Sequence, residues 1–197
     1  MFILFSVIMM LILFILLPAL AHSQQIFGGR CSDFTNTSIP NFDIDKYSGR
    51  WFEIYRYNNV IQMNADCTVV DVSKIDDNSF NADMKLKLFT PMTMHTKAHF
   101  IDPVKRNGKF IDKMPYLPEL EYWVLDTDYE TYTIEWSCIE FLKTNLQMLW
   151  VLARRPKIDE KTERKIQTVL KQNNLGKRGM RKSGNDPENC KCVYKDC

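Results

Sequence analysis

The chain has 197 residues, with 26 Lys and Arg against 24 Asp and Glu, and a formal net charge of +2. A chain of this length forms one domain with a sizeable core, and a charge so near zero argues against a nucleic-acid-binding protein, which needs a strong basic excess. The aromatic content of 12%, with only seven Gly and eight Pro, excludes a disordered or fibrous chain.

The first segment is typical of a secretory signal peptide. Residues 2–17 are apolar apart from one serine, and the small residues Ala19 and Ala21 fit a signal-peptidase site. We predict a signal peptide over residues 1–23 and a single domain over residues 24–197. The processed protein is then extracellular, with no membrane span. An uncleaved anchor is the alternative, because the same segment is long enough to cross a bilayer as a helix.

Six cysteines follow, and their spacing is unlike that of a metal site. They are Cys31, Cys67, Cys138, Cys190, Cys192 and Cys197. A zinc site usually offers two close pairs, which this pattern lacks, so we expect disulfides formed in an oxidising compartment. Asn36 begins an Asn-Thr-Ser glycosylation acceptor, which also favours a secreted glycoprotein. The sequence alone leaves the pairing of the cysteines open.

The middle of the chain has the alternation of apolar and polar residues that predicts β-strands. The clearest example is 80–88, where Phe80, Ala82 and Met84 alternate with Asn81 and Asp83. We predict eight strands, over residues 49–57, 67–75, 80–88, 94–100, 109–114, 122–127, 131–136 and 146–154.

Short turn segments separate these strands. Asn107-Gly108 is the strongest hairpin signal and favours a two-residue type I′ turn. Short connections imply antiparallel neighbours, and a flat sheet of this kind would leave two open edges and a wet apolar face. We therefore predict an all-β fold, an eight-stranded antiparallel up-and-down barrel shaped as a calyx.

One helix is predicted after the strands, over residues 158–170, with Asp159 as its N-cap and its apolar face packed on the outside of the barrel. The basic segment 176–184 follows, and we expect the tail from about residue 176 to be loop-like and solvated. Binding to a membrane or to heparin is the alternative for this segment.

Three short motifs resemble the signatures of the lipocalin family. They are Gly49-Arg50-Trp51, Thr127-Asp128-Tyr129 and Arg154. In lipocalins these motifs meet at the closed end of the barrel, where the arginine packs over the tryptophan. The resemblance implies that Trp51 plugs this barrel under Arg154, with the adjacent Arg155 as the alternative. A cation–π contact and hydrogen bonds to nearby carbonyls would hold such a plug.

Within that family, residues 122–132 and 152–156 resemble the branch of apolipoprotein D and the insect bilin-binding lipocalins. This resemblance implies the disulfides Cys31–Cys138 and Cys67–Cys190. On sequence grounds Cys192 can take the place of Cys190. The remaining cysteines are left to pair with each other or with another chain.

Motifs of catalysis are absent from the sequence. His95 and His99 lie on a predicted strand, about 13 Å apart, which is too far for one metal ion. There is no nucleophile elbow, P-loop or dinucleotide-binding motif. We expect neither a catalytic residue nor a metal site, and therefore no enzyme.

The barrel is expected to carry a small hydrophobic ligand, because an apolar interior buries the apolar area of such a ligand. The predicted lining residues are Met84, Leu86, Leu88, Met94, Phe100, Tyr122, Met148 and Trp150. A fatty acid, sterol or similar lipid is the favoured ligand, and a bilin such as biliverdin is the alternative that the resemblance implies. A third possibility is a filled barrel that acts through its surface in adhesion or signalling. The oligomeric state is left open.

Overall fold

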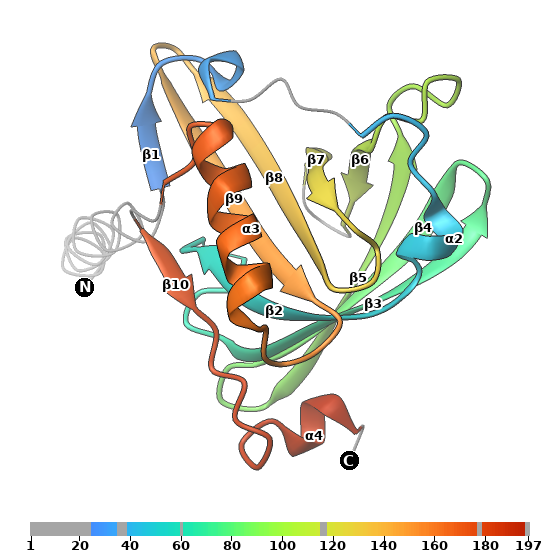
Figure 1. Cartoon of the computed structure of the whole chain (residues 1–197), viewed down its shortest axis with the longest axis vertical. Coiled ribbons are helices and arrows are strands. Elements are labelled where there is room, and N and C mark those ends of the chain that lie inside the picture. Colours follow the sequence, from blue (N-terminus) through green and yellow to red (C-terminus); the bar gives the residue numbers. More distant parts are fainter. Residues whose placement is uncertain (1–24, 35–38, 60, 115–117, 177–178, 196–197) are drawn as a thin grey trace, which may run out of the picture.

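Eight consecutive strands form a closed antiparallel barrel in the computed structural model of the chain (Figure 1). They are β2 (Gly49–Tyr57), β3 (Asp66–Asp76), β4 (Ser79–Lys87), β5 (Pro91–Phe100), β6 (Lys109–Lys113), β7 (Leu120–Thr127), β8 (Tyr132–Phe141) and β9 (Thr144–Ala153). Each strand pairs with the next, and β2 also pairs with β9, which closes the barrel. The predicted fold class is confirmed.

The structure describes residues 25–34, 39–59, 61–114, 118–176 and 179–195. The predicted signal peptide, the glycosylation acceptor Asn36 and the last cysteine, Cys197, lie outside these residues. No helix in the described ranges is long and apolar enough to cross a membrane.

Two short strands extend the sheet where β2 and β9 diverge. Strand β1 (Gln25–Gly28) pairs with β9, and β10 (Met180–Lys182) pairs with β2. The expectation of a loop-like tail from residue 176 is therefore wrong for β10. Arg181 of this strand forms an ion pair with Asp66 at 2.8 Å and donates to the Ala65 carbonyl. The positive charge of Arg181 is therefore paired with a carboxylate of the same chain.

The connection between β5 and β6 also differs from the predicted two-residue hairpin. It spans residues 101–108, and the Asp102 carboxylate accepts hydrogen bonds from two backbone N–H groups within it. Gly108 has a φ of +71°, and a Cβ there would lie 3.4 Å from the Val124 carbonyl oxygen. Glycine is thus required by a positive φ and a close strand approach, although the turn is not type I′.

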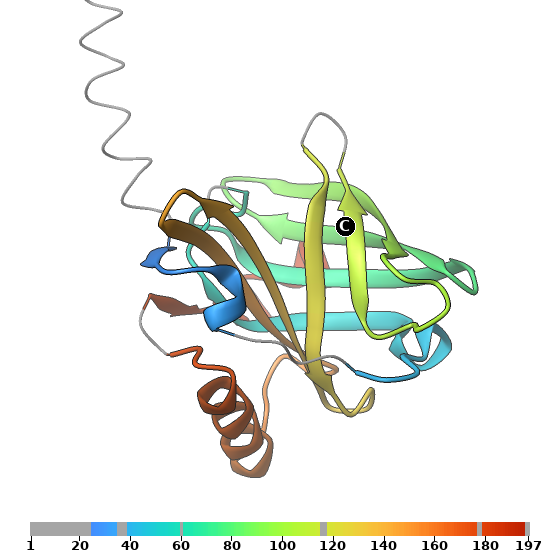
Figure 2. The same cartoon turned by 90° about the horizontal axis from the view of Figure 1, so that it is seen from above.

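Helix α3 (Glu160–Gln172) lies outside the ring of strands, as predicted (Figure 2). The Asp159 side chain caps it by accepting from the Thr162 N–H at 2.7 Å. Ile166 and Leu170 are buried against the outer face of the barrel. Their barrel partners are the apolar side chains Tyr132, Ile134, Trp136, Leu149 and Val151. Strands β8 and β9 are therefore covered by protein on their outer face.

Disulfides attach both ends of the described chain to the barrel. Cys31, in the short 3-10 helix η1 (Cys31–Asp33), is bonded to Cys138, and Cys67 is bonded to Cys190. Both are the pairs that the family resemblance implied. No cysteine in the described part of the chain is free.

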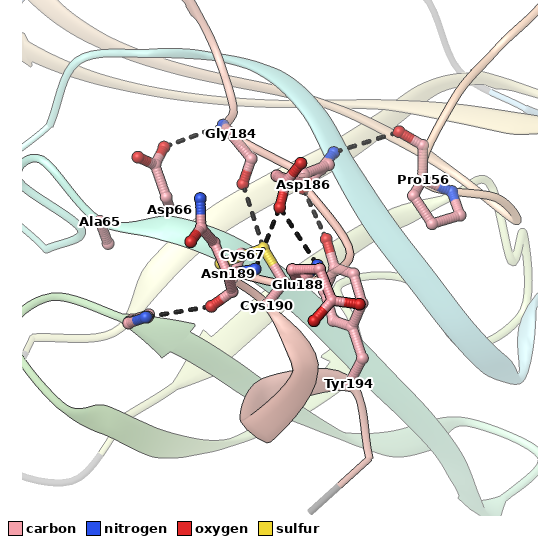
Figure 3. Close-up of a disulfide and its surroundings, with 12 residues drawn as sticks. Ala65, Asp66, Cys67, Pro156, Gly184, Asp186, Glu188, Asn189, Cys190 and Tyr194 are labelled. Atoms are coloured by element: carbon pink, nitrogen blue, oxygen red, sulfur yellow. Dashed lines mark hydrogen bonds between the residues drawn. A yellow bond between two sulfur atoms is a disulfide. The ribbon is translucent and has the colours of Figure 1, made fainter.

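The second disulfide holds the C-terminal segment and its helix α4 (Lys191–Tyr194) against β3 (Figure 3). Before it, the Asp186 carboxylate accepts from the backbone N–H groups of Glu188 and Asn189. The buried cysteine pair and Val193 form a small apolar cluster on the outside of the barrel. The barrel wall is thus supported from outside at two places, by this cluster and by α3.

Candidate functional site

The closed end of the barrel is built around Trp51 and Arg154. Trp51 is fully buried, and the Arg154 guanidinium carbon lies 3.7 Å from the centroid of its ring. Arg154 also donates to the carbonyls of Ser48, Arg50 and Tyr129 at 3.0–3.1 Å. Arg155, the alternative, is exposed. One arginine therefore joins three chain segments beneath the barrel.

The chain before Trp51 is shaped to admit this arginine. Helix α2 (Ile44–Tyr47) ends just before Gly49, which has a φ of +104°. A Cβ on Gly49 would lie 3.2 Å from Arg154 Nη1, so a side chain there would be strained and would crowd the guanidinium. The Trp51 indole N–H donates to the Tyr47 carbonyl at 2.9 Å, which fixes the ring.

The turn from β7 to β8 provides the third part of the closed end. Asp128 accepts from the Thr131 N–H at 2.7 Å, and the Thr127 hydroxyl donates to the Tyr132 carbonyl at 2.7 Å. Tyr129 has a φ of +64°, and its hydroxyl accepts from the Asp43 N–H at 3.2 Å. These side chains satisfy the backbone groups of the turn and place the Tyr129 carbonyl against Arg154.

A cluster of aromatic rings fills the barrel above this end. Phe110 is central to it, with ring centroids 4.6 Å from Phe100, 5.1 Å from Phe80 and 5.4 Å from Tyr122. Phe42 adds a further ring at 5.2 Å. The lower part of the barrel is therefore solid.

A lumen remains within the barrel, with about 80 Å³ of free space. Its lining residues are Tyr47, Glu53, Thr68, Val70, Val72, Phe80, Ala82, Met84, Thr96, Ala98, Asp112, Leu120, Tyr122, Glu135, Trp150 and Leu152. Because a water molecule needs roughly 10–15 Å³, this is room for several waters or one small organic molecule. It is smaller than the pockets of roughly 300–1,000 Å³ that hold drug-sized ligands.

The structure places three of the predicted lining residues, Met84, Tyr122 and Trp150, around this lumen. Phe100 belongs to the aromatic cluster below it. The other four predicted residues are not in its wall: Leu86, Leu88, Met94 and Met148. The alternation of apolar and polar residues identifies which side chains of a strand face inward. It does not tell how far along each strand the free space extends.

Four titratable groups of the lumen were not predicted: Tyr47, Glu53, Asp112 and Glu135. Glu135 lies between Ile134 and Trp136, and those two apolar side chains pack outward under α3. Since successive side chains of a strand alternate between faces, Glu135 must point inward. The sequence contains a signal for this orientation. The amphipathic helix predicted over residues 158–170 needs an apolar patch on the outer face of the barrel, and Ile134 and Trp136 provide it.

Glu53 is neutralised within a buried network. Its carboxylate forms an ion pair with Arg56 at 2.6 Å, and both side chains are fully buried. The Gln62 amide donates to the same carboxylate at 2.5 Å, and the Trp150 indole N–H donates to Gln62 at 2.6 Å. This network fixes the connection between β2 and β3 beside the lumen.

Asp112 and Glu135 have no such cationic partner. Glu135 accepts a hydrogen bond from the Tyr47 hydroxyl. Burial raises the pKa of Glu135 to about 7, with a smaller contribution from the neighbouring Asp112 charge. Burial also raises the pKa of Asp112 to about 6, and its buried Oδ1 atom has no hydrogen-bond partner. The lumen is therefore apolar in most of its wall and acidic at one place.

A metal site is not found in the described residues, where no three metal-binding side chains come together. His95 is exposed and lies 2.8 Å from Asp83, while His99 is half-buried on the same strand. Neither histidine lines the lumen.

A barrel sealed at one end around an internal space is the architecture of a small-molecule-binding protein. A family model described as "Lipocalin-like domain" matches residues 42–177. The chain belongs to the lipocalin family.

Named relatives cover most of the chain. Apolipoprotein D of Oryctolagus cuniculus is 31% identical over 176 residues, which cover 83% of this chain and 89% of the relative. The bilin-binding protein of Pieris brassicae is 25% identical over a stretch that covers 78% of this chain and 82% of that protein. Among solved structures, insecticyanin from Manduca sexta has a TM-score of 0.73 at 19% identity, covering 85% of this chain and 92% of that one.

Proposed function

We propose that the protein is an extracellular carrier that binds a small hydrophobic ligand in the lumen of its barrel. The observation that carries this proposal is a lumen closed at one end, with free space between mainly apolar side chains. Burying a ligand there gains roughly 25 cal/mol per Å² of apolar area removed from water. Met84 adds an adaptable wall, because its unbranched side chain can change rotamer to fit the ligand.

The extracellular location rests on the cysteines and on the first segment of the chain. Two disulfides join residues 107 and 123 positions apart, and such bonds persist in oxidising compartments. This supports the predicted signal peptide over residues 1–23 and glycosylation at Asn36. We infer binding rather than catalysis, because the sequence carries no catalytic motif and the described lining residues of the lumen include no cysteine.

The size and charge of the lumen favour a compact ligand over a tetrapyrrole. A relative is named for bilin binding, and biliverdin was the alternative from sequence. A bilin carries two propionates, but the lining residues that the structure describes include three carboxyl groups and no Lys, Arg or His. The free space of about 80 Å³ is also evidence against the filled barrel of an adhesion or signalling protein.

A compact neutral ligand tests the proposed function. Ethylbenzene is uncharged and has one aromatic ring with a short side chain, as the free space of the lumen requires, so its calorimetric titration should be saturable. Met84→Trp fills the lumen and should weaken binding at least ten-fold. Thr93→Trp adds the same bulk at an exposed position on the neighbouring strand and should leave binding unchanged. Absence of saturable binding, or equal binding by both variants, would contradict the proposal.

A further inference from the structure

The acidic place in the lumen has no counterpart in a purely apolar carrier. Asp112 on β6 and Glu135 on β8 reach the same cavity from opposite sides of β7. An acidic side chain is rarely enclosed without a partner, because removing its charge from water is costly. These two carboxyl groups therefore require an explanation that hydrophobic burial does not supply.

The structure itself provides little compensation for their charge. Glu53 is the third carboxyl group of the lumen and already has Arg56 as its partner. The other titratable groups that face the cavity are Tyr47 and Tyr122, whose pKa values are raised by burial, so both stay neutral. No cationic side chain is among the described lining residues, and the Asp112 Oδ1 atom is unpartnered.

The surrounding side chains suit a cation. The rings of Tyr47, Phe80 and Tyr122 line the same cavity, and aromatic faces attract cations, most strongly when water is excluded. An ammonium group can also donate up to three hydrogen bonds, which matches two carboxyl groups and a tyrosine oxygen. A carboxylate ligand would instead meet like charge in a low-dielectric space.

Building on the proposed function, we propose that the lumen selects small apolar amines, with the protonated amine held by Asp112 and Glu135. The hydrocarbon part then lies against the apolar wall formed by Val70, Ala82 and Met84. The free space of about 80 Å³ favours a compact skeleton such as a single aromatic ring with a short side chain.

Binding of an amine should be linked to protons. In the free protein burial raises the pKa of Asp112 to about 6 and that of Glu135 to about 7. A bound cation favours the ionised carboxylates and lowers both pKa values, so binding releases protons. Affinity for an amine should therefore rise from pH 5 to pH 8, while affinity for a neutral alcohol of the same shape stays flat.

Three ligands with one skeleton test the selection. Calorimetry at pH 7.5 on the intact, disulfide-bonded protein compares 2-phenylethylamine, 2-phenylethanol and 3-phenylpropionate. The amine should bind at least ten-fold more tightly than the carboxylate, with the alcohol between them. Equal binding of the three, or tighter binding of the carboxylate, would overturn this inference but leave the proposed function intact. Binding of none, together with no binding of ethylbenzene, would overturn both.

Isosteric variants then assign the selection to the two carboxyl groups. The Asp112→Asn, Glu135→Gln double variant should lose at least ten-fold in affinity for the amine and lose its pH dependence. Its binding of 2-phenylethanol should be unchanged, which also shows that the variant is folded. Glu130→Gln, at an exposed position, is the matched control and should behave as the unmodified protein. If the double variant keeps its preference for the amine, the assignment is wrong.

Discussion

At the scale of single residues, Arg154 contributes most to the closed end. It combines a cation–π contact with Trp51 and hydrogen bonds to the carbonyls of Ser48 just after α2, Arg50 at the start of β2 and Tyr129 in the turn before β8. Ser48 and Arg50 are close together in the chain, whereas Tyr129 is far from both, so Arg154 joins two distant segments to the end of its own strand. The arginine therefore holds the plug in place as well as covering it.

Replacing this arginine should destabilise the fold. Arg154→Ala leaves several part-buried carbonyls without a donor and should lower the free energy of unfolding by about 2–4 kcal/mol. Arg155→Ala removes the same charge from an exposed neighbour and should change it by less than about 0.5 kcal/mol. Urea unfolding followed by tryptophan fluorescence measures both. Equal effects of the two substitutions would show that the contacts of Arg154 are not important for stability.

Single residues of the site were harder to predict than those of the closed end. Gly49, Trp51 and Arg154 belong to sequence motifs, and their placement follows from the family resemblance. Asp112 and Glu135 belong to no motif. Glu135 looks like the polar, solvent-facing side of β8 until α3 is known to cover the opposite side.

At the scale of elements, alternation identified the eight barrel strands because each has one apolar face along most of its length. It missed β1 and β10, which are too short to show a period, and these strands exist because the edges of β2 and β9 are available for pairing. The loop of residues 101–108 was missed for another reason. Gly108 is required by the approach of Val124, which is a tertiary contact and not a local turn preference.

The two disulfides offer a matched comparison of how terminal elements are attached. The chain-entropy model gives each about 4–5 kcal/mol, because both close loops of similar length. Cys67 and Cys190 are also buried in an apolar cluster, whereas Cys31 and Cys138 are half-buried. The double variant Cys67→Ala, Cys190→Ala should therefore lose more stability in urea than Cys31→Ala, Cys138→Ala. The reverse order would show that the cluster around α4 adds nothing to the covalent bond.

At the scale of the whole molecule, stability and binding are largely separated in space. Helix α3 on one side and the disulfide-bonded C-terminal segment on another pack on the outer face of the barrel, and the aromatic cluster at the closed end shares Phe80 and Tyr122 with the lumen wall. The lumen wall can therefore carry unpaired carboxyl groups and flexible side chains without loss of the fold. This arrangement allows one barrel to accommodate different ligands through changes in a few inward-facing residues.

The four tryptophans provide the most direct test of the central claim, that the ligand site is the interior of the barrel. Trp150 lines the lumen and donates its indole N–H to Gln62, whereas Trp123 packs outside the barrel against Trp136 and Lys109. A ¹⁵N–¹H NMR titration with ethylbenzene follows both indole signals in one experiment. We predict a saturable shift of the Trp150 signal and an unmoved Trp123 signal. A shift of Trp123 with Trp150 unchanged would place the ligand on the outer surface and contradict the account.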